Sequence, residues 1–241
     1  MRVSLPVAGT LAASAAVVAG LRLSFGSRSQ LFGDFPYAGA DAELVVALTF
    51  DDGPNEPWTS MILDTLAERG VPGTFFQVGR CAQRHPETTQ RVVDEGHVLG
   101  NHSLTHELGS YLRDADQRAE VTLGRLALAE IAGVTPRLYR PPWLCHWPWV
   151  LRGIAGTGSQ VVSGTFVHPL EVFQPEPRRL VAGAERAAAP GAMIIVHDGR
   201  ESRGGFRGQT AAAVGPIIDR LRRRGYGFTT VDRLLGVAPY A

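Results

Sequence analysis

The sequence predicts an α/β fold in which helices cover a parallel sheet. Seven short apolar runs alternate with seven stretches of helical spacing between residues 44 and 235. Strict alternation of this kind is typical of parallel sheets. Hydrophobic residues make up 44% of the 241 positions and charged residues 20%, as in an ordinary globular protein. Seven units fit an open doubly wound sheet and also a barrel, and periodicity does not separate the two.

The first four units each pair a buried apolar run with a helical stretch. Gly70, Gly96 and Gly133 stand where helices end, and Pro86 stands near the first position of a helix. Both placements are typical of helix boundaries. The predicted units are strand Leu44–Phe50 with helix Thr59–Arg69, strand Gly73–Val78 with helix Pro86–Glu95, strand His97–Gly100 with helix Asp114–Ala132, and strand Arg137–Arg140 with helix Trp147–Ile154.

The last three units follow the same pattern. Pro190-Gly191 predicts a turn before a strand, and Thr210 suits the start of a helix that stops at Gly225. The predicted units are strand Gln160–Ser163 with helix Arg178–Ala188, strand Ala192–Val196 with the helix after Thr210, and strand Gly227–Val231 with a short helix at Asp232–Leu235.

The amino terminus is a different kind of segment. Residues 3–21 carry no charge and lie between Arg2 and Arg22. This length falls between the apolar region of a signal peptide, about 7–15 residues, and a spanning helix of about 20. We expect residues 1–30 to be a signal peptide or membrane anchor, residues 31–43 a linker, and residues 44–241 one catalytic domain. We expect the protein to work outside the cytoplasm, either secreted or associated with the membrane through residues 3–21. We also expect it to be a monomer.

Composition excludes several function classes. All 24 basic residues are arginine, so there is no lysine for a Schiff base or a Walker A phosphate loop. The net charge of +1 excludes nucleic-acid binding driven by bulk charge. Cys81 and Cys145 each follow a strand of a chain that we expect to be exported, so a disulfide between them is predicted.

Polar residues gather directly after four of the predicted strands. Because the carboxyl ends of parallel strands meet at one edge of a sheet, these segments should converge there. They are Asp51-Asp52-Gly53-Pro54, Asn101-His102-Ser103-Leu104-Thr105-His106, Arg140-Pro141-Pro142-Trp143 and His197-Asp198-Gly199.

The first two segments suit a metal site, although each also has a simpler interpretation. Adjacent Asp51 and Asp52 point in different directions, so one can bind a metal while the other faces a substrate; the alternative is an ordinary turn. His102 and His106 are four residues apart, which places both imidazoles on one face of a helical turn. Two histidines with one carboxylate are a catalytic zinc pattern. The alternative is a pair of capping or surface histidines.

The other two segments suit acid–base chemistry. Arg140 could orient a carboxylate through a bidentate contact, or it could be a surface arginine. His197 ends the apolar run Met193–Val196 and could act as a general acid, or it could be a hydrogen-bonded core histidine.

Taken in order, these motifs resemble those of the polysaccharide deacetylases, also called carbohydrate esterase family four or the NodB-homology domain. The resemblance runs from about Val45 to Leu235. Four family motifs are matched, namely the first by Thr49-Phe50-Asp51-Asp52-Gly53-Pro54, the second by Gly100–His106, the third by Arg140-Pro141-Pro142-Trp143, and the fifth by Ile195-Val196-His197-Asp198.

The resemblance implies a distorted (β/α)7 barrel and specific roles for the matched residues. A divalent metal, most often zinc with cobalt as the alternative, would be held by Asp52, His102 and His106. Asp51 would be the general base, and Arg140 would hold and tune it. The backbone N–H of Trp143 would stabilise the oxyanion, and His197 would protonate the leaving amine.

The family's fourth motif, Asp-x-x-Asp-Trp, is missing. Residues 161–171, where it should lie, contain no aspartate. By spacing, Thr165 and His168 would take the two aspartate positions. A neutral residue there would leave His197 without a negative neighbour, so its pKa should be lower than in relatives that keep the aspartate. Glu171, six residues beyond Thr165, is the alternative source of that charge.

The resemblance implies removal of N-acetyl groups from an extracellular or cell-wall glycan such as peptidoglycan or a chitooligosaccharide. Two alternatives stay open. One is an O-acetyl esterase acting on xylan-like polymers. The other is a catalytically weakened glycan-binding barrel, which the missing fourth motif favours.

Overall fold

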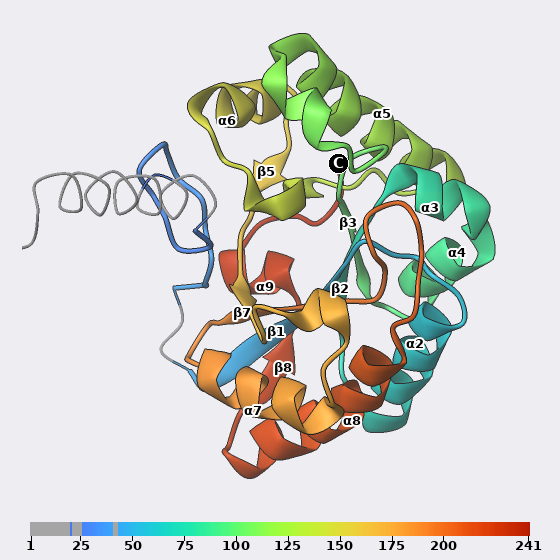
Figure 1. The fold of residues 1–241 in the computed structure, drawn as a ribbon, viewed down its shortest axis with the longest axis vertical. Coiled ribbons are helices and arrows are strands. Elements are labelled where there is room, and N and C mark those ends of the chain that lie inside the picture. Colours follow the sequence, from blue (N-terminus) through green and yellow to red (C-terminus); the bar gives the residue numbers. More distant parts are fainter. Residues whose placement is uncertain (1–19, 21–25, 41–42) are drawn as a thin grey trace, which may run out of the picture.

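A parallel sheet that curls into a split barrel forms the centre of the protein, and helices surround it (Figure 1). The computed structural model describes residue 20, residues 26–40 and residues 43–241. Most of the predicted signal or anchor segment lies outside these residues. Within the described part of the chain, no helix is long and apolar enough to cross a membrane.

The sheet has the strand order β5-β4-β3-β2-β1-β7-β6, and β8 also pairs with β1. Since β5 and β6 stand at the two ends of this order, the barrel stays open between them. The predicted α/β barrel-like architecture is confirmed. The strands are β1 (Val45–Asp51), β2 (Thr74–Gln77), β3 (Val98–Asn101), β4 (Leu138–Tyr139), β5 (Gln160–Val161), β6 (Thr165–Phe166), β7 (Met193–His197) and β8 (Gly227–Thr229).

The predicted helices agree with the observed ones to within three residues at each end, whereas α3, β6 and three 3-10 turns were not predicted. The short helix α3 follows β2. The predicted strand Gln160–Ser163 is shorter in the structure, where it is β5, and the further strand β6 follows after Gly164, at which a Cβ would lie 2.7 Å from Ile195 Cγ1. The helices are α2 (Trp58–Arg69), α3 (Gly79–Arg84), α4 (Pro86–Asp94), α5 (Asp114–Ala132), α6 (Pro148–Ala155), α7 (Pro177–Ala187), α8 (Gly208–Arg223) and α9 (Val231–Leu235), with 3-10 turns η1 (Leu108–Leu112), η2 (Pro142–Leu144) and η3 (Glu171–Phe173).

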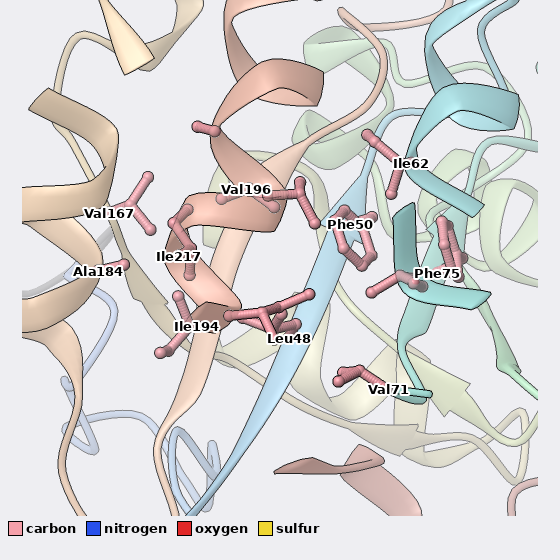
Figure 2. Close-up of a cluster of buried hydrophobic side chains, with 14 of the residues drawn as sticks. Leu48, Phe50, Ile62, Val71, Phe75, Val167, Ala184, Ile194, Val196 and Ile217 are labelled. Carbon is pink, nitrogen blue, oxygen red and sulfur yellow. The ribbon is translucent and has the colours of Figure 1, made fainter. Parts of the chain in front are cut away.

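The central strand β1 separates the apolar layer from the polar interior. Side chains alternate between the two faces of a strand. Leu48 and Phe50 therefore point outward and pack with Ile62 of α2 and Ile217 of α8 in the main core (Figure 2). The residues between and after them, Thr49 and Asp51, are also buried, but they face the inside of the barrel. The hydrophobic pattern of the strand thus holds a carboxylate inside the fold.

The segment before β1 packs on the barrel. Phe35 is completely buried and contacts Leu144 and Ile195. Ala38 forms an antiparallel bridge with Ala192, and the Ser163 N–H donates to the Pro36 carbonyl at 2.6 Å. Much of the predicted linker is therefore attached to the catalytic domain near the split between β5 and β6.

The predicted disulfide is wrong, because Cys81 and Cys145 are both free and buried. Cys81 lies in α3, where Arg84 Nη2 is 3.1 Å from its sulfur, whereas Cys145 packs in an apolar cluster with Tyr111 and Val150. Burial raises the pKa of the two thiols, to about 12 for Cys81 and about 11 for Cys145. Both therefore stay protonated near neutral pH.

Candidate functional site

A pocket of about 290 Å³ lies at the carboxyl ends of the strands. Six of the seven predicted site residues line it, and the seventh, Arg140, is completely buried. The predicted convergence of the four polar segments is therefore observed. The six lining residues are Asp51, Asp52, His102, His106, Trp143 and His197.

Asp51 and Asp52 diverge because the backbone changes conformation between them. Asp51 is the last residue of β1 and pairs with Phe76 of β2 and His197 of β7. Asp52 has a φ of 75°, in the left-handed region. Gly53 follows in a close approach, since a Cβ there would lie 2.0 Å from Asp198 Oδ2. The turn therefore directs the two carboxylates to different partners.

Arg140 holds Asp51 from beneath the pocket. Its Nη1 donates to Asp51 Oδ1 at 2.7 Å and to Thr49 Oγ1 at 2.7 Å, while Nη2 donates to the Ser163 carbonyl at 2.7 Å. The contact thus uses one nitrogen and is not the bidentate pair that was expected. Thr49 and Ser163, which the sequence did not single out, complete the hold on the guanidinium.

His102 and His106 meet at Asp52, but not on a helical turn as predicted. Residues 102–106 form a loop in which Ser103 and His106 have φ values of 73° and 61°. The His106 N–H donates to Ser103 Oγ at 3.0 Å. Glu120 of α5 accepts from both the N–H and the hydroxyl of Thr105, at 2.8 and 2.9 Å. Tertiary contacts with α5 therefore bring the two rings together, and helical periodicity does not.

The three side chains offer a fitting donor set for a divalent metal. The Nε2 atoms of His102 and His106 lie 3.2 and 3.1 Å from Asp52 Oδ1, and one ligand atom from each residue lies within 4.8 Å of the others. His102 Nδ1 is 2.6 Å from the Arg140 carbonyl, which can only accept, so Nδ1 carries a proton and Nε2 is the nitrogen that faces Asp52. Asp52 Oδ1 is buried without a hydrogen-bond partner. These residues can hold a metal such as zinc.

Asp52 is ionised at neutral pH. Burial would raise its pKa, but the neighbouring imidazoles outweigh burial and hold the pKa well below its usual value. Its Oδ2 accepts from the Glu201 N–H at 2.8 Å. The carboxylate is thus fixed from one side and faces the two histidines with its other oxygen.

His197 is paired with Glu171, which lies at the start of η3. His197 Nδ1 is 2.9 Å from Glu171 Oε2, and the His197 N–H donates to Oε1 at 2.9 Å. Thr210 Oγ1 of α8 donates to Oε1 at 3.1 Å, and the ring of Phe166 stacks on the His197 ring with centroids 5.9 Å apart. The carboxylate is therefore held by three hydrogen bonds.

This pairing sets the direction in which the pKa of His197 is shifted. Burial lowers the pKa, but the charge and hydrogen bond of Glu171 outweigh burial and raise it to about 9. The expectation that His197 has no negative neighbour is wrong, and Glu171 is the alternative source of charge that the sequence left open. Thr165 instead lies in β6, paired with Ile194, and His168 Nδ1 accepts from the Leu170 N–H at 3.1 Å.

Asp198, the last residue of the fifth motif, has a structural role through hydrogen bonds to the segment after β1. Thr59 Oγ1 donates to its Oδ2 at 2.7 Å, and Asn55 Nδ2 donates to its carbonyl at 3.0 Å. Burial raises the pKa of Asp198 to about 7. It connects the end of β7 to the loop that carries Asp52.

Sequence reasoning missed Arg207, which is buried and lines the pocket. It belongs to no motif and lies ten residues after His197 in the loop before α8. A charged residue in a loop has no periodic signal, so only the folded structure could place it here.

Comparisons with known proteins agree with the geometry. A family model described as polysaccharide deacetylase matches residues 38–162. A chitooligosaccharide deacetylase of Bradyrhizobium is 35% identical, over 82% of this chain and 94% of that protein. The peptidoglycan-N-acetylmuramic acid deacetylase PdaA of Bacillus subtilis is 32% identical, over 83% of this chain and 74% of that protein.

A solved structure gives the same result. The crystal structure of a peptidoglycan N-acetylglucosamine deacetylase superposes with a TM-score of 0.79 at 26% identity, and covers 86% of this chain and 95% of that chain. The fold, the ordered motifs, the family model and the sequence identities agree, and the chain belongs to the polysaccharide deacetylase family.

Proposed function

We propose that this protein is a metal-dependent hydrolase that removes the acetyl group from N-acetylated sugars of peptidoglycan or a chitooligosaccharide. The observation that carries the proposal is the division of labour around one pocket. Asp51 is held by Arg140, Asp52 faces His102 and His106, and His197 is paired with Glu171. These are the parts of a metal-assisted amide hydrolysis, namely a base, a set of metal ligands and an acid.

Asp52, His102 and His106 would hold the metal. When bound, a divalent cation lowers the pKa of water and polarises a carbonyl. The remaining chemistry belongs to residues of this chain.

Asp51 is placed to act as the base. Arg140 Nη1 donates to both Asp51 Oδ1 and Thr49 Oγ1, which fixes the carboxylate and leaves Oδ2 to accept a proton. As the oxygen of a water molecule attacks the acetyl carbon, Asp51 takes the proton that the water gives up. The backbone N–H of Trp143, a residue that lines the pocket, would stabilise charge on the carbonyl oxygen.

His197 is placed to act as the acid. Glu171 engages Nδ1, so Nε2 is the nitrogen left to face the pocket. A pKa of about 9 keeps the imidazolium form at neutral pH. When the C–N bond breaks, His197 donates its proton to the leaving nitrogen, and the products are acetate and the free amine. This supported acid counts against the weakened binding barrel.

We place the reaction outside the cytoplasm, because residues 3–21 are uncharged and flanked by arginines, as in an exported or anchored chain.

The test is acetate release from chitooligosaccharides, peptidoglycan and acetylxylan before and after chelation. We expect release from an N-acetylated glycan, loss on chelation, and recovery with zinc or cobalt. Undiminished release by thoroughly metal-free protein would contradict metal dependence. Release from acetylxylan alone would identify an O-acetyl esterase instead.

A further inference from the structure

Arg207 is a buried cation in the wall of the pocket, and its hydrogen-bonding capacity is only partly used. It immediately precedes α8 and is 1% exposed, yet it lines the pocket. Its Nε and Nη1 atoms have no hydrogen-bond partner. A buried, unpaired charge is strongly unfavourable in a protein interior, so this guanidinium is suited to receive an anion.

The carboxylates around Arg207 are already engaged by other groups. Glu171 accepts hydrogen bonds from His197 and Thr210, and Asp198 accepts one from Thr59. Asp52 faces the two metal-ligand histidines. Among the described residues, no carboxylate forms an ion pair with Arg207 within 4.0 Å. Glu171, Asp52 and Asp198 attract the guanidinium only from beyond ion-pair distance, which leaves it free to pair directly with an anion of the ligand.

We propose that Arg207 recognises a carboxylate carried by the substrate on the carbon next to the acetamido group, as in an N-acetylmuramic acid residue. The inference rests on the proposed function, which places the acetamido group beside Asp51 and Asp52. A lactyl ether on the adjacent ring carbon then brings its carboxylate into the same small pocket, where Arg207 is the buried cation. A planar guanidinium binds a carboxylate through two parallel hydrogen bonds.

The pocket wall also suits the rest of the lactyl group. Phe166 and Val172 line the pocket and are partly exposed, which offers an apolar surface to the lactyl methyl group. A neutral N-acetylglucosamine residue would leave Arg207 unpaired. Arg207 therefore makes the protein prefer acidic amino sugars over neutral ones.

The test compares peptide-free peptidoglycan glycan strands with the same strands after their lactyl carboxylates are converted to methyl esters. The ester keeps the shape and removes the charge. We expect wild-type protein to prefer the acid in kcat/KM by about tenfold, mainly through KM, as for loss of a charge-assisted contact. Arg207→Gln should reduce this preference to about one, and Arg207→Lys should retain part of it. Arg203→Gln, on the same loop with its side chain 82% exposed, is the matched control and should keep the wild-type preference.

Comparing kcat/KM for the acid and the ester within each variant separates recognition of the carboxylate from general damage to the fold. Equal use of acid and ester by the wild type, or an unchanged preference in Arg207→Gln, would overturn the proposal. Binding of the two strands to the Asp51→Asn variant, measured by calorimetry, gives the same ratio without turnover. If no glycan releases acetate, the proposed function fails, and the calorimetric ratio still decides whether Arg207 reads the carboxylate.

Discussion

The two sides of the pocket are built in different ways. On the side of β1, β3 and β4, the side chains of Asp51, His102 and Arg140 lie on or directly after their strands. On the side of β6 and β7, His197 ends a strand, but its carboxylate comes from Glu171 in the 3-10 turn η3. The comparison teaches that a required charge can be supplied from an irregular segment when the regular position lacks it.

The largest effect should come from the side of β1, β3 and β4, where we propose different roles for the adjacent Asp51 and Asp52. Asp51→Asn should lower kcat for acetate release by about a thousandfold, because the proposed general base is lost, while the bound metal is retained. His102→Ala should lose the metal as well. Metal analysis of both purified variants, beside their rates, checks this. An Asp51→Asn protein without metal and a His102→Ala protein with metal would show that the two roles are reversed.

The next effect concerns Phe35, which joins the two sides. It packs against Leu144 beside Trp143 and against Ile195 of β7. Phe35→Ala should lower the free energy of unfolding by about 3–5 kcal/mol, as for other buried phenylalanines. Denaturant unfolding measures this. Phe173→Ala, at a side chain that is 75% exposed, is the control and should change stability little; equal losses in both would contradict the packing role of Phe35.

The smallest effect should come from Thr165, the position that spacing alone assigns to the missing aspartate. Phe166 lines the pocket, and neighbouring residues of a strand point to opposite faces. Thr165 therefore points away from His197. We expect Thr165→Asp to leave the alkaline limb of the rate profile where it is. A shift of that limb to higher pH would show that Thr165 faces the histidine and that the two sides of the pocket are built alike.

Most of the pocket residues on the side of β1, β3 and β4 could be predicted from the sequence, but only part of those on the side of β6 and β7. Strand ends of a parallel sheet converge, so the segments after the strands could be placed together without a structure. Glu171 could only be offered as an alternative, because a 3-10 turn after a two-residue strand has no readable period. Arg207 and Phe35 carry no motif, and their positions depend on loop packing. The disulfide failed because cysteine count and export indicate a redox environment and say nothing of the distance between two thiols.

The central claim is that Glu171 supplies the negative charge that keeps His197 protonated. The most direct measurement is the pKa of the His197 imidazole by NMR in metal-free protein, for the wild type and Glu171→Gln. Glu176→Gln, an exposed neighbour paired with Arg178, is the control. The wild type should titrate well above 6.5, at about 9.

Glu171→Gln removes the charge that opposes burial, so the pKa should fall to 6.5 or below. His197 would then be deprotonated at lower pH, and the alkaline limb of kcat/KM should move in the acid direction in the same variant. The control should titrate like the wild type. An unchanged pKa in Glu171→Gln would contradict the account, because the charge beside His197 would then come from elsewhere.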